Sequence, residues 1–227
     1  SPAGAPEPGP IAGRGGPAPR SRATLSRMAV PALRRATIAD LLAAEDAGHA
    51  CEIIDGELVE KAAGDVGHGW AQGSVMGGLH DTYNRRPGRS GPPGGWWILT
   101  EVDIAFGADV LRPDLSGWRR DRIPVMSKAF PVPDAPDWVC EVLSVSTAGR
   151  DLGVKKDIYH RAKVAYYWVV DRANRLFFVY RWSERAYELA LTATVEETVR
   201  AEPFPYVALF VGGLFGIERD EPEAGAP

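Results

Sequence analysis

The segment from Asp137 to Asp171 constrains the fold of this chain more than any other. It predicts an apolar strand, a Ser/Thr-rich turn, a helix and a second apolar strand. The first strand carries an acid, Glu141, among apolar residues. An ionised carboxylate in a buried strand is costly unless a cation or a metal ion lies beside it. Glu141 therefore predicts a partner elsewhere in the chain.

Composition indicates one domain with a hydrophobic core and two tails. The chain has 227 residues, of which 45% are hydrophobic. Few large apolar residues occur near the N-terminus, so we expect a disordered Pro/Gly/Arg-rich arm over 1–35, a domain over 36–218 and a disordered tail over 219–227. The net charge of −4 argues against broad, nonspecific adhesion to nucleic acid but leaves room for a local basic groove.

Cysteine usage and hydropathy indicate a cytoplasmic protein that does not cross a membrane. Cys51 and Cys140 lack the spacing of a zinc site or a disulfide framework, so a reducing compartment is the simplest setting. The longest apolar stretch, Tyr206 to Ile217, is shorter than the roughly 20 residues that a membrane-spanning helix needs.

The remaining pattern predicts an α+β, or mixed α/β, fold in which helices flank a sheet. Thr37 and Asp40 are spaced as a capping box at the start of a helix that reaches Ala47, and Asp55-Gly56 predicts a two-residue hairpin turn. One more helix and four strands are expected beside the central segment, over Gly67–Tyr83, Trp96–Phe106, Val110–Trp118, Leu176–Trp182 and Tyr187–Val195.

A lysine is expected to face inward from the central helix. If 151–162 is an α-helix, its apolar residues gather on one side, and Lys155 lies near the centre of that side. Lys156 lies at its border, so a shift of one residue would exchange the two lysines. The inward lysine either extends to solvent or meets an anion such as Glu141. The residues on that side are Leu152, Val154, Ile158, Tyr159 and Ala162.

A second acid, Asp114, follows Pro113 in the expected strand VLRPDLSGW. Proline suits a strand edge or a bulge, which can redirect the next side chain. Two strand carboxylates and a backbone carbonyl would make an oxygen-lined site for Mg²⁺ or Mn²⁺. Such an ion activates water and neutralises charge on a phosphate, and a nearby lysine could orient the nucleophile or stabilise the same charge.

Three features, in their order along the chain, resemble the PD-(D/E)XK nuclease superfamily. They are the Asp114 and Glu141 pair, the string EVLSVST, and then RDLGVKKDIYHRAKVAYYWVVD. The resemblance is to its Uma-two branch of restriction-endonuclease-like proteins, and it runs from about Thr37 to Leu189. It implies a restriction-endonuclease-like mixed β-sheet flanked by helices. It also implies a metal-dependent endonuclease that acts on nucleic acid, with DNA as the expected substrate and a homodimer as a possible assembly.

The resemblance also implies roles for particular residues. Asp114 and Glu141 would bind Mg²⁺ or Mn²⁺ together with the Val142 carbonyl, and Lys155 would be the active-site lysine. The superfamily lysine two residues after the acid is replaced here by Leu143, as is usual in this branch.

Two further residues match the family pattern less closely. Glu57 matches a family acid that the resemblance implies to be a catalytic residue reaching the site from the first helix and hairpin, and His68 falls near a family histidine. Val145 and Lys163 depart from the family pattern, which has proline and glycine at these places.

Each assignment has a structural alternative. Glu141 could form only a salt bridge, Asp114 could cap a turn, Lys155 could extend to solvent, Glu57 could be a solvated hairpin residue, and His68 favours a helix start over a catalytic base. The strand that carries Pro113-Asp114 (the PD motif) and the loop after it form either a phosphate-binding groove or an ordinary solvated segment. At the level of function, the alternative is a catalytically inactive nuclease fold that binds nucleic acid or protein. The basic residues of the loop are Arg112, Arg119, Arg120, Arg122 and Lys128.

Overall fold

A computed structural model describes residues 4, 9, 34–87, 93–144, 149 and 151–219, and for 151 it describes only the backbone. The chain divides into two units, Ser1–Arg34 and Arg35–Pro227, and the fold below belongs to the second. The expected N-terminal arm and C-terminal tail lie almost entirely outside the described residues, as does Val145.

The N-terminal part of the fold is a capped helix followed by a tight hairpin. Helix α1 (Ile38–Asp46) begins at Thr37, and the expected capping box with Asp40 is present. Strands β1 (Cys51–Ile54) and β2 (Glu57–Glu60) pair antiparallel, with Ile54 opposite Glu57. The turn between them has φ values of 52° and 84°, the left-handed conformation that Asp-Gly favours. Both local predictions are confirmed.

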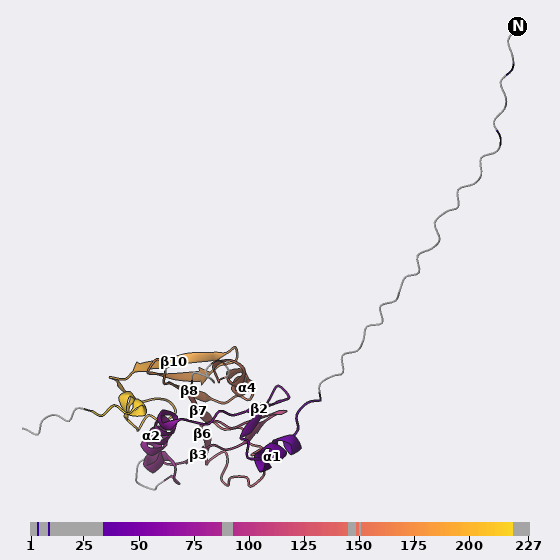
Figure 1. Ribbon diagram of the computed structural model, residues 1–227. Helices are drawn as coiled ribbons and strands as arrows, with labels where there is room; N and C mark the ends of the chain where they lie inside the picture. The colour runs from indigo at the N-terminus through magenta and orange to yellow at the C-terminus, as the bar shows by residue number, and fades with distance from the viewer. Residues whose placement is uncertain are drawn as a thin grey trace, which may run out of the picture. The chain divides into compact units, whose positions relative to one another are not determined.

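A six-stranded sheet forms the centre of the fold, with the strand order β10-β9-β8-β7-β6-β3. The central pair, β7 and β8, is parallel because the chain crosses between these strands through a helical segment, and the other pairs are antiparallel. Figure 1 shows the sheet flanked by helices, which confirms the predicted fold class. The strands are β3 (Trp96–Thr100), β6 (Leu115–Arg119), β7 (Trp138–Leu143), β8 (Tyr166–Asp171), β9 (Leu176–Trp182) and β10 (Tyr187–Thr194).

Two strands that the sequence predicts as continuous are broken. Trp96–Phe106 divides into β3 and β4 (Ile104–Phe106), and Val110–Trp118 divides into β5 (Asp109–Leu111) and β6. The chain turns at Glu101, where φ is 53°, and at the segment before Asp114, which contains a proline. Strands β4 and β5 leave the large sheet and join β1 and β2 in a second sheet, of order β2-β1-β5-β4. One long hairpin thus connects the two sheets.

The central helix differs from the prediction. Asp151–Lys155 forms a π-helical turn, and the α-helix α4 (Lys156–Arg161) follows it. The wider π turn changes the angular spacing of side chains, so Leu152 and Val154, which were expected to face inward, are exposed. Lys155 nevertheless points inward and is 3% exposed, which agrees with the predicted orientation. Lys156 lies over the ring of Tyr180 instead, with its Nζ 3.6 Å from the ring centroid.

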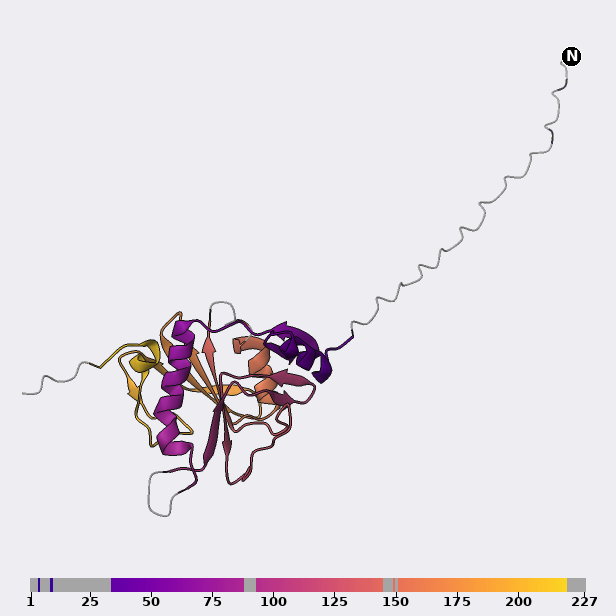
Figure 2. The ribbon, with the colours of Figure 1, turned by 60° about the horizontal axis from the view of Figure 1, so that its bottom comes forward.

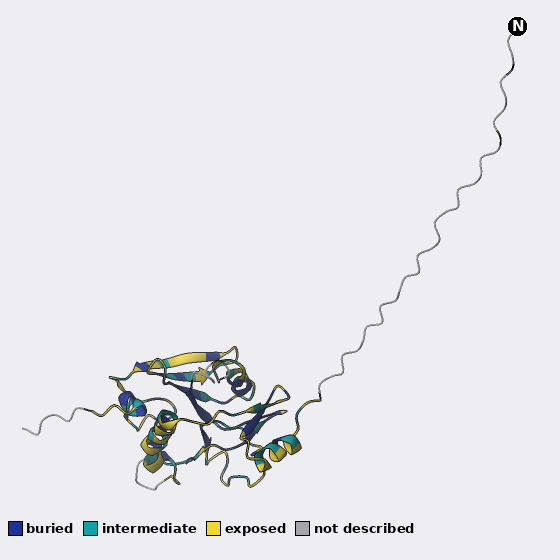
Figure 3. Ribbon diagram, in the orientation of Figure 1, coloured by how far each residue is buried: buried dark blue, intermediate teal, exposed yellow. Residues whose placement is uncertain are grey.

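Two hydrophobic clusters cover the two faces of the large sheet. Helix α2 (Val66–Tyr83) packs on one face through buried residues at four-residue spacing, and Figure 2 shows it lying across the strands. Helix α4 and the β4–β5 hairpin pack on the other face. Figure 3 shows the central strands largely buried and the outer faces of the helices exposed.

The C-terminal segment, which contains the apolar stretch Tyr206 to Ile217, completes the first face. It contains β11 (Thr198–Val199), β12 (Leu209–Phe210) and a 3₁₀ helix, Val211–Phe215. No helix among the described residues is long and apolar enough to span a membrane. Both cysteines are buried free thiols, as expected.

Phe204 is predicted to be a major contributor to stability. Replacing it with alanine should lower the free energy of unfolding by about 3–5 kcal/mol because a cavity would remain in the core. The exposed neighbour Tyr206 provides the control, and Tyr206→Ala should change this free energy by less than about 0.5 kcal/mol in urea unfolding. Equal effects would contradict the packing described. The ring of Phe204 makes edge-to-face contacts with Tyr83, Trp96, Trp138 and Trp168.

Candidate metal centre

Asp114 lies where β6 and β7 separate. Residues Leu115 to Gly117 of β6 pair with β7, and the pairing ends before Val142. The N–H of Val142 therefore has no strand partner on the β6 side. The Oδ2 atom of Asp114 accepts a hydrogen bond from this N–H at 2.7 Å. Asp114 is 2% exposed. Its carboxylate therefore replaces the missing strand hydrogen bond and is fixed beside Glu141, the preceding residue of β7.

The other oxygen of Asp114 faces a lysine and a histidine. Lys61 Nζ lies 3.0 Å from Oδ1, and His68 Nε2 lies 3.3 Å from it. Burial alone would raise the pKa of Asp114, but the hydrogen bond from His68, the charge of Lys61 and the N–H of Val142 together lower it to about 2. Asp114 is therefore an ionised, buried carboxylate at neutral pH.

Glu101 brings a second carboxylate to the same place. Its Oε2 atom accepts from Lys61 Nζ at 2.6 Å, and its Oε1 atom accepts from Gln72 at 3.1 Å. One possible ligand atom from each of His68, Glu101 and Asp114 lies within 4.8 Å of the others. Two carboxylates and an imidazole suit a divalent cation, and the predominance of oxygen favours Mg²⁺ or Mn²⁺.

Glu141 belongs to an adjoining buried network. Tyr159 donates its hydroxyl to Glu141 Oε1 at 2.5 Å, and Lys155 Nζ lies 3.3 Å from the same atom. Lys155 Nζ is closer to Glu52 Oε1, at 2.9 Å. Glu52, on β1, is fully buried, and within the described part of the chain its Oε2 atom has no hydrogen-bond partner. A buried carboxylate oxygen of this kind is an available ligand for a cation.

The backbone of Arg112 connects the two networks. Its N–H donates to Glu52 Oε1 at 2.8 Å, and its carbonyl accepts from Lys61 Nζ at 2.9 Å. The Arg112 side chain points the other way and pairs with Asp103 and Glu45. The break between β5 and β6 thus holds both networks together.

Each lysine of the two networks contacts two carboxylates. Within the described part of the chain, Lys61 contacts Glu101 and Asp114, and Lys155 contacts Glu52 and Glu141. The carboxylates also act on Lys61: burial favours its neutral form, but the charges of Asp114, Glu141 and Glu101 outweigh burial and raise its pKa.

A pocket of about 480 Å³ gives solvent access to this cluster. Lys61, His68, Gln72, Glu101 and Arg112 are among the residues that line it. On the Lys155 side, Lys155 is 3% exposed and Tyr159 is fully buried. Burial and the nearby charges of Glu141 and Glu52 raise the pKa of Tyr159, so it remains a hydrogen-bond donor to Glu141.

The structure brings most of the residues singled out from the sequence together. Asp114, Glu141, Lys155 and His68 all lie in these contacts, and His68 is also in the first turn of α2, with its N–H donating to Asp65. Val142 contributes its N–H through the bond to Asp114.

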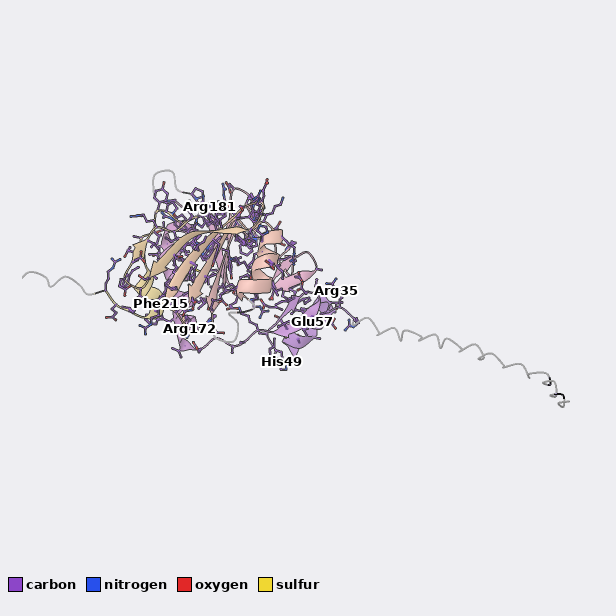
Figure 4. The ribbon with its side chains drawn as sticks, turned by 90° about the horizontal axis from the view of Figure 1, so that it is seen from above. Arg35, His49, Glu57, Arg172, Arg181 and Phe215 are labelled. Carbon is purple, nitrogen blue, oxygen red and sulfur yellow. The ribbon has the colours of Figure 1, made fainter. Side chains whose placement is uncertain are left out.

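Glu57 is the exception. It is an exposed residue of β2, and Figure 4 places it on the side of the small sheet together with Arg35 and His49. No contact between Glu57 and the cluster is present among the described residues. In the first hairpin, the acid that reaches the cluster is Glu52, because it lies on the buried strand β1.

Three residues of the cluster were missed by sequence reasoning. Glu52 carried a usable signal, since it is an acid in an apolar strand, as Glu141 is. Glu101 follows an apolar strand, but its importance depends on the chain break that brings it beside Asp114. Lys61 follows the hairpin and carries no pattern that separates it from a solvated lysine.

The basic loop after the PD motif is largely neutralised within the protein. Arg119 pairs with Asp121, and Arg122 pairs with Asp137. The Arg120 guanidinium lies 3.3 Å from the centroid of the Trp97 ring. These contacts favour the interpretation of this segment as an ordinary loop over a phosphate-binding groove.

Comparison with known proteins agrees with the predicted family and fold. A model of the Uma2 family, the Uma-two branch named above, matches residues 38–211 and is described as "Putative restriction endonuclease". A crystal structure from Anabaena variabilis ATCC 29413, described as a "putative nuclease belonging to DUF820", superposes with a TM-score of 0.64 at 20% identity. The alignment covers 80% of this chain and 98% of that one, and it shows a shared fold. No curated protein gives a significant match.

His68 should stabilise the protein only while it is protonated. The hydrogen bond to Asp114 raises its pKa above 6.5, although partial burial opposes this. A raised pKa in the folded state contributes stability that is complete below pH 6.5 and is lost as the pH rises through the folded value. In EDTA, His68→Gln should therefore cost more unfolding free energy at about pH 6 than at about pH 9. The control is His80→Gln, an exposed change on the same helix; a His68 cost that grows with pH would contradict the assignment.

Proposed function

Because the chain belongs to the Uma2 family, we propose that it is a divalent-metal-dependent endonuclease that hydrolyses phosphodiester bonds of nucleic acid, with DNA as its substrate. The observation that carries the proposal is the convergence of four carboxylates on two lysines beside an open pocket. Buried carboxylates are costly, and a divalent ion beside this pocket would stabilise them.

Asp114 is the central ligand of the proposed Mg²⁺ or Mn²⁺ site. Glu141 and the carbonyl of Val142 complete the set that the family resemblance implies, and His68 and Glu101 are ligands that the geometry adds. In a strand, the N–H and C=O of one residue point to the same side, so the Val142 carbonyl faces the side of β7 where Asp114 lies. When bound, the ion would activate water and neutralise charge on the phosphate.

Lys155 and Tyr159 position Glu141 in this proposal. The ammonium group lies between Glu141 and Glu52, and the Tyr159 hydroxyl fixes the same oxygen of Glu141. These contacts orient the buried carboxylate of Glu141. Because Lys155 is 3% exposed, it acts on the reaction through Glu141 and not by direct contact with the phosphate.

Cleavage of plasmid DNA should require both the metal and the acid pair. Activity should be present with Mg²⁺ or Mn²⁺, absent in EDTA, and reduced at least about 100-fold in Asp114→Asn and Glu141→Gln, because each removes a ligand charge. Glu188→Gln, which makes the same chemical change at an exposed position of β10, is the control and should cleave like the wild type. RNA and single-stranded substrates measured in parallel test the assignment of DNA.

Cleavage that survives EDTA, or that is unchanged in Asp114→Asn, would contradict the proposal. The competing function is a nuclease fold that binds nucleic acid or protein without turnover. It is favoured if binding of nucleic acid persists in both variants while calorimetry detects no Mg²⁺ or Mn²⁺ binding by the wild type.

Replacing each of the two acids of the first hairpin, Glu52 and Glu57, should have different effects on cleavage. Glu52→Gln should lower cleavage by about 10- to 100-fold because Lys155 loses a charged partner and Glu141 is then held less firmly. Glu57→Gln should stay within about twofold of the wild type because Glu57 is exposed. Thermal unfolding of both variants separates an effect on activity from loss of the fold. The opposite order of effects would restore the assignment that the resemblance gave to Glu57.

A further inference from the structure

Lys61 occupies an unusual position for a lysine. Its Nζ atom contacts three oxygens from three different segments: Glu101 Oε2 at 2.6 Å, the Arg112 carbonyl at 2.9 Å and Asp114 Oδ1 at 3.0 Å. An ammonium group has three donors, so these contacts use all of them. The side chain is 14% exposed. A cation is thus enclosed by the carboxylates of the candidate metal centre.

We propose that Lys61 is a built-in cation that holds the divalent-ion position in the metal-free protein and leaves it when the ion binds. The inference rests on the proposed function. Asp114 Oδ2 accepts from the N–H of Val142, and Oδ1 is the oxygen that faces Lys61 and His68. A divalent ion that binds Asp114 Oδ1 and Glu101 Oε2 takes oxygens that the ammonium group now contacts, and two cations at contact distance from the same oxygens repel each other.

The surroundings allow Lys61 to move. Lys61 lines the pocket of about 480 Å³, so its flexible side chain can turn toward solvent without disturbing the core. Lys155 has no such freedom, because its side chain is 4% exposed and lies between Glu52 and Glu141. The two lysines therefore differ in role: Lys155 is a permanent part of the buried network, and Lys61 is displaceable. After displacement, Lys61 stays at the pocket that opens onto the centre.

Calorimetric titration with Mn²⁺ tests the proposal without any cleavage assay. Lys61→Met removes the ammonium group and keeps an unbranched side chain, so Mn²⁺ no longer competes with it. The dissociation constant should fall by about 10- to 100-fold, corresponding to the loss of charged hydrogen bonds that the ion must break in the wild type. Lys156→Met is the matched control. It makes the same change of charge on α4, where Lys156 contacts Tyr180, and this variant should bind Mn²⁺ like the wild type.

Thermal unfolding provides a second readout. Without metal, Lys61→Met should melt at a lower temperature than the wild type because two carboxylates lose their cation, and saturating Mn²⁺ should raise its melting temperature by more than it raises that of the wild type. A merely structural lysine would weaken Mn²⁺ binding when removed. Equal or weaker binding by a folded Lys61→Met variant would overturn the proposal and leave the nuclease function intact.

A crystal structure of the wild type soaked in Mn²⁺ keeps the proposal testable if the variant does not fold. The expected result is an ion on Asp114 with Lys61 Nζ moved away from Glu101 and Asp114. An ion bound while Lys61 keeps both contacts would overturn the inference alone. Absence of Mn²⁺ binding by the wild type in both calorimetry and crystals would overturn the metal-dependent function and this inference together.

Discussion

The site depends on one hydrogen bond, the one that Asp114 accepts from the N–H of Val142 at the place where β6 leaves β7. A strand that ends inside a sheet exposes a backbone donor in a buried region, and such a donor must be paired. Asp114 pairs it with a carboxylate, which introduces a buried negative charge. Lys61, His68 and the neighbouring acids then surround this charge. The sheet topology thus creates both the separation of β6 from β7 and the buried carboxylate of Asp114 at that place.

The two lysines solve the same electrostatic problem in different ways. Lys155 comes from the π-helical turn, and that turn presents it to Glu52 and Glu141 beneath the helix, where solvent does not reach. Lys61 lies after the first hairpin and approaches the centre from the pocket. Low solvent access strengthens the contacts of Lys155 with Glu52 and Glu141. Access to water makes the contacts of Lys61 exchangeable. One half of the centre is therefore fixed and the other can accept a ligand.

Local sequence patterns predicted the elements well because their causes are local. The capping box of α1 and the Asp55-Gly56 turn depend on residues within a few positions of each other, and both are present. The π turn and the division of two long strands were missed because they depend on packing between sheets, which periodicity does not encode. The acid of the first hairpin was misplaced for the same reason. Burial of β1 against β5, decided by distant segments, directs Glu52 to the centre and leaves Glu57 exposed.

The buried acid in an apolar strand proved to be the most useful sequence signal, and its physical basis explains why. Such an acid is costly alone, so its presence requires a partner, and partners of buried charges are themselves drawn into the core. Glu141 leads to Lys155, Lys155 leads to Glu52, and the Arg112 backbone leads from Glu52 to Lys61 and Asp114. Following each buried charge to its partner reaches every member of the centre except His68 and Glu101, which join it through Asp114 and Lys61. Charge compensation, more than any single motif, connects these distant parts of the sequence.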